Sequence, residues 1–216
     1  MPASFNALIV EGTHGVGKST LIDALIRKHV GESPERKIRT FLHLAQSHTY
    51  GPLAHGEDAG TLTVAQNLAH LEHIVEILEW LERSVRDHQR AACFAIVDTL
   101  HLTHCVRPGR VQWRDVAPID ERLGRIGCKL LLLEGSPRTI RARGIQAAAG
   151  TQFLTEYAVK FGSTTEELCA YFVREQAIIK DLAARSSIPR MMLDADGALD
   201  DLAEAAYGYW VRPSTA

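Results

Sequence analysis

The sequence predicts an α/β fold in which helices flank a five-stranded parallel sheet, giving three layers. Short apolar segments alternate with longer segments of helical periodicity, a pattern typical of repeated strand–helix–strand units. The apolar segments are nearly unbroken, as in strands that are buried on both faces. A glycine-rich turn joins the first of them to an amphipathic helix. The 216 residues and 46% hydrophobic content suit one domain over residues 1–216.

The elements are predicted in chain order from these patterns. Strands are expected at residues 6–10, 38–42, 93–97, 129–133 and 190–193. Helices are expected from Lys18 toward His29, over 63–89, over 115–126, from Ser136 with Pro137 in the first turn, and over 165–184. Segments 43–61 and 101–114 lack clear periodicity and are predicted to be long loops.

The glycine-rich turn is the most specific motif. Its residues, Gly12-Thr13-His14-Gly15-Val16-Gly17-Lys18-Ser19-Thr20, fit the pattern G-x-x-x-x-G-K-[ST]. Glycines let backbone N–H groups converge on phosphate oxygens, while Lys18 carries a charge to the β and γ phosphates. Ser19 would supply a hydroxyl to Mg²⁺, and the helix that follows adds its positive dipole end. The motif predicts a P-loop NTPase that binds ATP and Mg²⁺ through residues 12–20.

Asp98 ends the third predicted strand. Ligands of open parallel sheets collect at the carboxyl ends of the strands, so Asp98 should face the same crevice as the phosphate loop. Its carboxylate would either hold Mg²⁺ through water or accept a proton from an attacking hydroxyl. The alternative is a carboxylate that caps the following turn.

Three arginines follow the fourth predicted strand, at Arg138, Arg141 and Arg143. Arg138 and Arg141 are neighbours on a helix, whereas Arg143 lies on another side. Phosphoryl transfer needs cations that engage the migrating group, and a guanidinium matches phosphate geometry in two hydrogen bonds. At least one of the three is expected to serve this role.

These segments resemble thymidylate kinases and deoxynucleoside kinases, which belong to the P-loop kinases. The resemblance lies in Val10-Glu11-Gly12, in the segment 133–137 followed by Arg143, and in residues 193–199. It implies a lid over about 138–163, with Arg143 in that lid over ATP, and an adenine site bordered by 194–197. The long helix from Thr63 and the loop before it would help to wall the acceptor pocket.

Two departures from the family concern the acceptor. Thymidylate kinases usually have an acidic residue at the position of His14 and an arginine at that of Thr99, while deoxynucleoside kinases usually place Glu-Arg-Ser where this chain has Asp98-Thr99-Leu100. The donor side is therefore retained and the acceptor side changed. We expect an acceptor other than dTMP.

The histidines permit two interpretations. His101, His104 and Cys105 form an H-x-x-H-C segment, but it lacks the second ligand pair that zinc sites use. The functional interpretation is that His101, His104 or His14 contacts the acceptor or a phosphate; the alternative is that their hydrogen bonds are satisfied by neighbours or water. Arg107 and Arg110 would bind a phosphate already on the acceptor, or are simply exposed.

Composition and charge exclude several classes of protein. A formal net charge of −2 gives no electrostatic footprint for a nucleic acid polymer or a membrane surface. No signal peptide or membrane-spanning run is evident, so a cytoplasmic protein is expected. The four cysteines are widely spaced and predict reduced thiols. By analogy with related kinases, the long helix from Thr63 is the candidate interface of a homodimer.

The predicted activity is ATP-dependent phosphoryl transfer to a small-molecule acceptor, a nucleotide or a nucleoside. Lys18 and an arginine from 138–143 would stabilise the transferring charge, and Asp98 would orient or deprotonate the acceptor. The alternative is a nucleotide-binding switch or NTP hydrolase coupled to a protein partner. The chain has no evident guanine-specifying Asn-Lys-x-Asp motif, and its third predicted strand ends in one aspartate rather than an Asp-Glu pair. Both observations count against that alternative.

Overall fold

The computed structural model describes residues 4–32, 39–58, 60–87, 92–106 and 111–212. In this part of the chain a five-stranded sheet has the order β2-β3-β1-β4-β5, and every neighbouring pair is parallel. The strands are β1 (Ser4–Glu11), β2 (Arg39–Leu44), β3 (Ala92–Asp98), β4 (Lys129–Glu134) and β5 (Arg190–Asp194). All five predicted strands are present; residue 38, the expected start of the second, lies outside the described residues.

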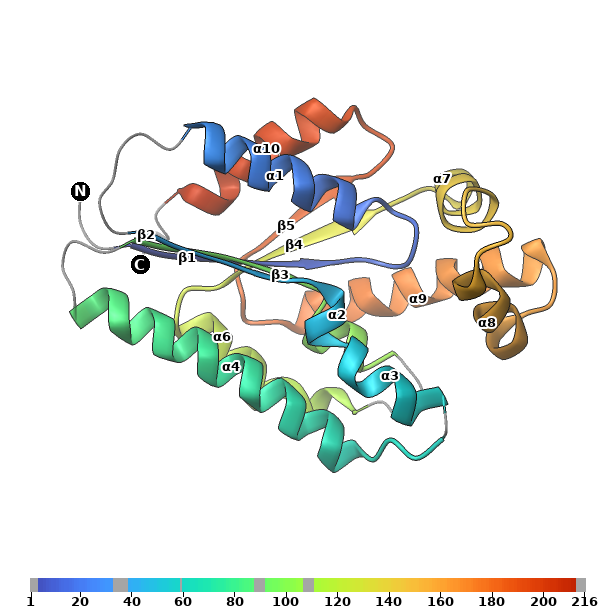
Figure 1. Cartoon of the computed structure of the whole chain (residues 1–216), viewed down its shortest axis with the longest axis horizontal. Coiled ribbons are helices and arrows are strands. Elements are labelled where there is room, and N and C mark those ends of the chain that lie inside the picture. The colour runs from blue at the N-terminus through green and yellow to red at the C-terminus, as the bar shows by residue number, and fades with distance from the viewer. Residues whose placement is uncertain (1–3, 33–38, 59, 88–91, 107–110, 213–216) are drawn as a thin grey trace.

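Helices cover both faces of this sheet (Figure 1). On one face lie α1 (Lys18–Glu32) and α10 (Leu199–Val211), and on the other α4 (Val64–Asp87), α6 (Trp113–Arg125) and α9 (Thr165–Arg185). Alternate residues of β1 pack into two apolar clusters. Leu8 and Val10 belong to one cluster and Ala7 and Ile9 to the other, and all four side chains are fully buried. Burial on both faces explains the unbroken apolar strands. The three-layer prediction is confirmed.

Polar contacts cap one flanking helix and join two others. α9 begins with a capping box, in which the Thr164 hydroxyl accepts from Glu167 N at 3.2 Å and the Glu167 carboxylate accepts from Thr164 N at 3.1 Å. Arg122 of α6 donates to both carboxylate oxygens of Glu79 on α4, at 2.9 and 3.0 Å, and also to Glu72. The Arg122 bridge therefore fixes α6 against α4, and the capping box defines the start of α9.

Two of the predicted loops contain helices, so those predictions were wrong. Segment 43–61 holds α2 (Gln46–Thr49) and α3 (Gly51–Asp58), and segment 101–114 holds α5 (His101–His104) and the start of α6. Pro52 does not break α3 because a proline in the first helical turn has no hydrogen bond to lose. α5 is held by contacts with a residue far away in the sequence, described below.

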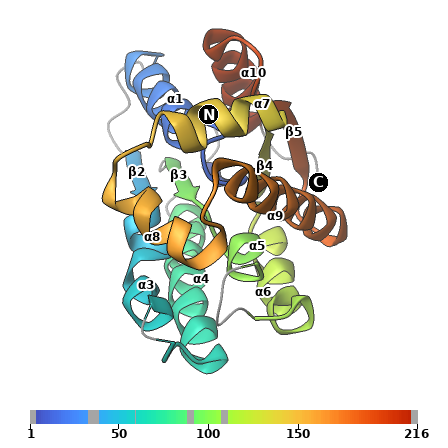
Figure 2. The same ribbon diagram turned by 90° about the vertical axis from the view of Figure 1, so that its right-hand side faces the viewer.

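After Ser136 the polypeptide forms a series of short helices that project past the carboxyl ends of the strands (Figures 1 and 2). They are α7 (Pro137–Thr139), the π-helix η1 (Ile140–Gln146) and α8 (Gln152–Phe161). The predicted start at Ser136 is confirmed, since its hydroxyl accepts from Thr139 N at 3.2 Å. α8 lies within residues 138–163, for which the family resemblance implies a lid. Among the described residues, no helix is both long and apolar enough to span a membrane.

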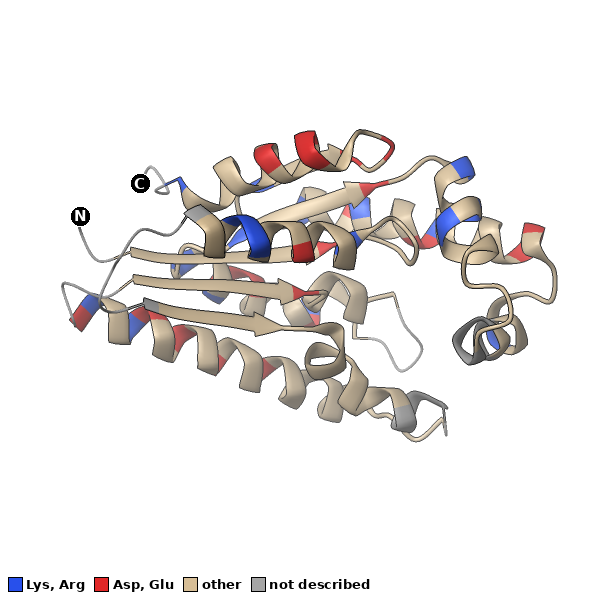
Figure 3. Ribbon diagram, turned by 45° about the horizontal axis from the view of Figure 1, so that its top comes forward, with Lys and Arg blue, Asp and Glu red and all other residues tan. Residues whose placement is uncertain are grey.

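Charge is unevenly distributed over the molecule. Basic residues gather on the segment that begins with α7, whereas α4 is mainly acidic and has its Lys and Arg positions only near its C-terminal end (Figure 3). The basic segment lies at the carboxyl edge of the sheet, the edge where parallel sheets bind ligands.

Candidate functional site

The turn between β1 and α1 has the backbone geometry of an anion-binding loop. Gly12, Gly15 and Gly17 have φ angles of 149°, 80° and 94°, values that side chains rarely allow. Such a backbone turns successive N–H groups toward one point. Ser19 and Thr20 lie exposed in the first turn of α1, next to this point. The expected strand, loop and helix start are all in place.

The Lys18 side chain lies along this loop. Its ammonium donates to Gly12 O at 2.8 Å and to Thr13 O at 3.0 Å. The charge is thus located at the loop, as the motif predicts.

The side chains of Thr13 and His14 turn toward α9. The Thr13 hydroxyl donates to the carboxylate of Glu175, which is only 2% exposed. The His14 ring lies 5.3 Å from the ring of Phe172, centroid to centroid. The side chains of these two residues therefore tie the loop to α9.

The tip of the loop touches η1 through two glycines. A Cβ on Gly15 would lie 2.2 Å from the Cα of Gly144, and a Cβ on Gly144 would lie 3.2 Å from His14 O. Real Cβ atoms essentially never come as close as the first distance, and the second is tighter than most real Cβ contacts. The absence of side chains at both positions thus permits η1 to sit directly on the phosphate loop.

This contact brings Arg143 to the loop. Its Nη1 donates to Ala195 O at 3.0 Å and would lie 3.7 Å from a Cβ on Gly17. Arg143 also lines a cavity of about 160 Å³ beside the loop. The other lining residues are Val16, Gly17, Thr20, Leu21, Leu133, Ala195, Gly197, Leu199 and Leu202.

The other two arginines are placed differently. Arg141 pairs with Glu166 of α9 at 2.8 Å, and this ion pair raises the pKa of Arg141. Arg138 is exposed in α7. The structure therefore brings Arg143, and neither of these, against the phosphate loop; the roles of Arg138 and Arg141 stay predictions.

Asp98 lies at the end of β3, beside the strand that leads into the loop. It pairs in register with Val10 and is 5% exposed. The Thr99 hydroxyl donates to Asp98 Oδ1 at 3.0 Å, and the Thr49 hydroxyl donates to Asp98 O at 2.7 Å. The register thus places Asp98 beside Val10, two residues before the phosphate loop begins, and Thr99 holds one carboxylate oxygen. The role of Asp98 toward Mg²⁺ or the acceptor stays a prediction.

A cluster of polar side chains lies next to Asp98, and the sequence analysis missed part of it. His104 Nδ1 lies 2.5 Å from Asn67 Oδ1, and both residues are fully buried. Tyr50 meets the His104 ring edge-on at 5.2 Å, and His70 Nε2 lies 2.8 Å from Thr49 O. Asn67 could have been found from its position within the apolar periodicity of α4.

The structure also shows how His101 and the four cysteines are placed. His101 Nε2 lies 3.0 Å from Asp120 Oδ1 inside the core, so this histidine has a structural hydrogen bond. Among the described residues, no group of three or more His, Cys, Asp or Glu is placed to hold a metal. All four cysteines are buried and free, and burial raises the pKa of Cys93 to about 11. Arg107 and Arg110 lie outside the described residues.

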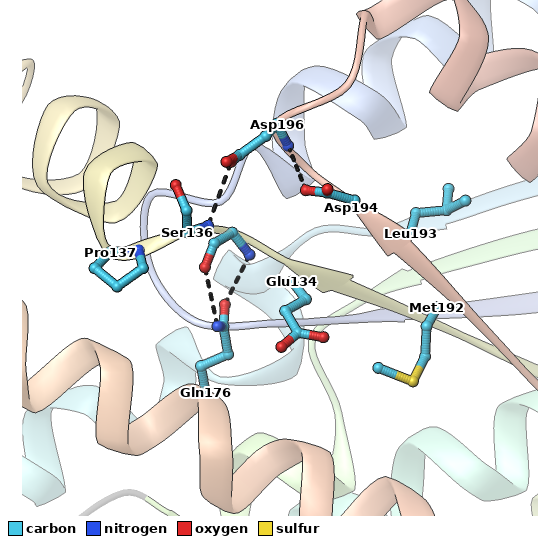
Figure 4. A pocket seen from close by; sticks show the side chains of 9 residues that line it. Glu134, Ser136, Pro137, Gln176, Met192, Leu193, Asp194 and Asp196 are labelled. Carbon is cyan, nitrogen blue, oxygen red and sulfur yellow. Dashed lines mark hydrogen bonds between the residues drawn. The ribbon is translucent and has the colours of Figure 1, made fainter.

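A second cavity, of about 380 Å³, lies at the ends of β4 and β5 (Figure 4). The Gln176 side-chain amide accepts from Gly135 N at 2.9 Å and donates to Gly135 O at 3.0 Å, which fixes one wall. Asp196 Oδ1 accepts from Ser136 N at 3.3 Å on another. Glu134, at the rim, pairs with Lys180. Most polar groups that line this cavity are thus already hydrogen-bonded or paired within the protein.

Comparisons with known proteins support the fold. No protein-family model and no curated protein matches the chain in sequence. Among solved structures, YorR protein from Bacillus subtilis, in complex with phosphorylated GDP, is similar with a TM-score of 0.55 and 12% identity over 94% of each chain. Shikimate kinase from Acinetobacter baumannii, in complex with shikimate, has a TM-score of 0.52 and 14% identity over 96% of this chain and 93% of that chain. The chain shares the fold of these two proteins. At these identities the similarity establishes the fold alone.

Proposed function

We propose that this protein transfers the γ-phosphoryl group of ATP to a hydroxyl of a small molecule. The observation that carries the proposal is the contact between η1 and the phosphate loop, which brings the Arg143 guanidinium against a loop that already holds the Lys18 ammonium. Two cations beside an anion-binding turn suit the charge that develops during phosphoryl transfer.

The donor nucleotide would bind with its phosphates on residues 12–20 and its base in the cavity beside Arg143. That cavity is lined by apolar side chains and by the backbone of the segment after β5. A flat heteroaromatic base fits such a lining. The resemblance to thymidylate kinases places adenine near residues 194–197, and Ala195 and Gly197 of this segment border the cavity.

The donor set suits Mg²⁺. Ser19 offers an exposed hydroxyl in the first turn of α1, and Asp98 offers a carboxylate on the neighbouring strand. Mg²⁺ usually keeps several waters and binds one or two protein oxygens together with phosphate oxygens, so two such groups suffice. Bound there, the ion would neutralise charge on the β and γ phosphates. Asp98 would hold it through water or accept the proton of the acceptor hydroxyl.

We propose a nucleoside or a nucleotide as the acceptor, other than dTMP, and the charge of the chain favours the nucleoside. Residues 40–82, which include α2, α3 and most of α4, contain neither Lys nor Arg. In the related kinases this part of the chain walls the acceptor pocket. A phosphate group on the acceptor needs cations, and the candidates left for that role are Arg107 and Arg110.

The test is an acceptor screen that measures ADP release from Mg-ATP. Each nucleoside is compared with its own 5′-monophosphate, and dTMP and other hydroxylated metabolites are included. We expect one acceptor to stimulate release, and Lys18→Ala to reduce that release by orders of magnitude while the protein stays folded. Lys28→Ala, on the same helix and bridged to Glu204, is the matched control and should keep turnover.

Three outcomes would contradict parts of this proposal. Preferred turnover of dTMP would overturn the expectation of a different acceptor. Preferred turnover of monophosphates over nucleosides, abolished by joint substitution of Arg107 and Arg110, would overturn the nucleoside preference. Slow ATP hydrolysis that no acceptor stimulates would identify a nucleotide-binding switch or hydrolase instead of a kinase.

A further inference from the structure

Glu11, the last residue of β1, carries a carboxylate that is fully buried. Its Oε1 accepts from the backbone N–H groups of Leu100 at 2.9 Å and Leu102 at 3.2 Å, with Thr103 N at 3.5 Å. Its Oε2 accepts from the Thr103 hydroxyl at 2.6 Å. The partners of this one carboxylate thus all come from the segment that follows Asp98.

Burial of a carboxylate is costly unless hydrogen bonds satisfy it. A buried polar group that loses its hydrogen-bond partners is costly. The donors of segment 100–103 that converge on Glu11 therefore tie this segment to the end of β1. Glu11 also directly precedes Gly12, the first residue of the phosphate loop.

The held segment includes a backbone turn that needs support. Thr99 has a φ of 66°, an unfavourable value for a β-branched residue, and its N–H donates to Val10 O at 2.9 Å. Such a conformation persists only where its surroundings over-determine it. Glu11 holds the chain after Thr99, and Thr49 holds Asp98 O before it.

We propose that Glu11 is a positioning residue that couples the phosphate loop to Asp98. It contacts neither nucleotide nor acceptor; it sets where the Asp98 carboxylate lies relative to the bound phosphates. This inference rests on the proposed kinase function. It predicts that substitution of Glu11 slows phosphoryl transfer while ATP binding is preserved, because the glycines and Lys18 remain in place.

The experiment compares Glu11→Gln and Glu11→Ala with the wild type. Glutamine retains one carbonyl oxygen for the three N–H groups, and the Thr103 hydroxyl can turn to accept from the amide, so geometry is weakened rather than lost. We expect kcat to fall about tenfold in Glu11→Gln and about 100-fold in Glu11→Ala, since a misplacement of about 1 Å costs about that much. The Kd of a non-hydrolysable ATP analogue should change less than about threefold.

A readout separate from activity is amide hydrogen exchange. Exchange in residues 98–106 should accelerate in both variants, while exchange in α1 is unchanged. Glu204→Gln is the matched control, because it also removes a hydrogen-bonded carboxylate, that of the bridge to Lys28, but on α10 and away from segment 100–103. It should leave kcat and exchange in 98–106 at wild-type values.

The outcomes separate this inference from the proposed function. Wild-type protein without acceptor-dependent turnover overturns both. Wild-type turnover with an unchanged kcat in Glu11→Gln overturns the inference alone. An ATP-analogue affinity that falls as much as kcat also overturns it, since Glu11 would then support the phosphate loop itself. If Glu11→Ala does not fold, Glu11→Gln still decides the question.

Discussion

Arg143 and Arg141 lie two residues apart on η1 and face different partners. The Arg143 guanidinium is bound to Ala195 O next to the phosphate loop, whereas that of Arg141 is bound to Glu166. For Arg143→Ala we expect a large fall in kcat and a smaller change in the Kd of ATP. A lid arginine acts mainly on charge that develops in the transition state, so its loss should affect turnover more than ground-state binding.

Arg141→Ala is the matched comparison, since it removes the same charge from the same helix. Its exposed ion pair contributes little, and its loss should reduce kcat less than the loss of Arg143 does. Steady-state kinetics with the acceptor found in the screen, together with ATP titration, measure both effects. The reverse ranking would assign the transferring phosphoryl group to Arg141 instead.

At the scale of elements, the phosphate loop and η1 require a glycine at Gly15. Alanine there would place its Cβ 2.2 Å from Gly144 Cα, so that η1 and Arg143 must move away from the loop. We expect Gly15→Ala to reduce kcat at least about tenfold, because displacement by an ångström costs about that much or more. Acceptor-dependent ADP release is the measurement.

Gly150→Ala separates this steric contact from backbone strain. Gly150 has the same φ of 80°, but a Cβ there would meet no atom within 4 Å. Its replacement should cost about 1 to 2 kcal/mol of stability through the unfavourable φ, and kcat should be retained. Equal losses of kcat in the two variants would show that strain, and not the contact with η1, explains the effect.

The elements also show how far the sequence could be read. The strands, the phosphate loop and the long helices were predictable because their signals are local: apolar runs, a fixed glycine and lysine spacing, and a period near 3.6. α5 and the anchoring of the loop were not, because they depend on contacts between distant residues. Glu11 binds a segment 89 residues away, and Thr13 binds Glu175 across 162 residues. A weak signal existed in Glu175, an acidic residue in the buried stripe of α9.

At the scale of the whole molecule, Asp120 joins parts of the core that are far apart in the sequence. Its carboxylate, 2% exposed, accepts from Ser187 N at 2.7 Å, from the Ser186 and Ser187 hydroxyls, and from His101. It thereby links α5 and α6 to the connection between α9 and β5. Burial raises the pKa of Asp120, but these hydrogen bonds outweigh burial and bring the pKa below its ordinary value.

Stability in acid should therefore depend on this carboxylate. A group whose pKa is lower in the folded state stabilises the fold above its unfolded pKa, about 4, and this contribution is lost as the pH falls through the folded pKa. We expect Asp120→Asn to lower the free energy of unfolding by about 2 kcal/mol at pH 7, measured by urea denaturation, with the difference from wild type narrowing below about pH 4. Asp181→Asn, an exposed position on α9, should show no such difference. A gap of constant size from pH 7 to pH 3 would mean that the side-chain amide fails to pack, and that the charge of Asp120 contributes nothing to stability.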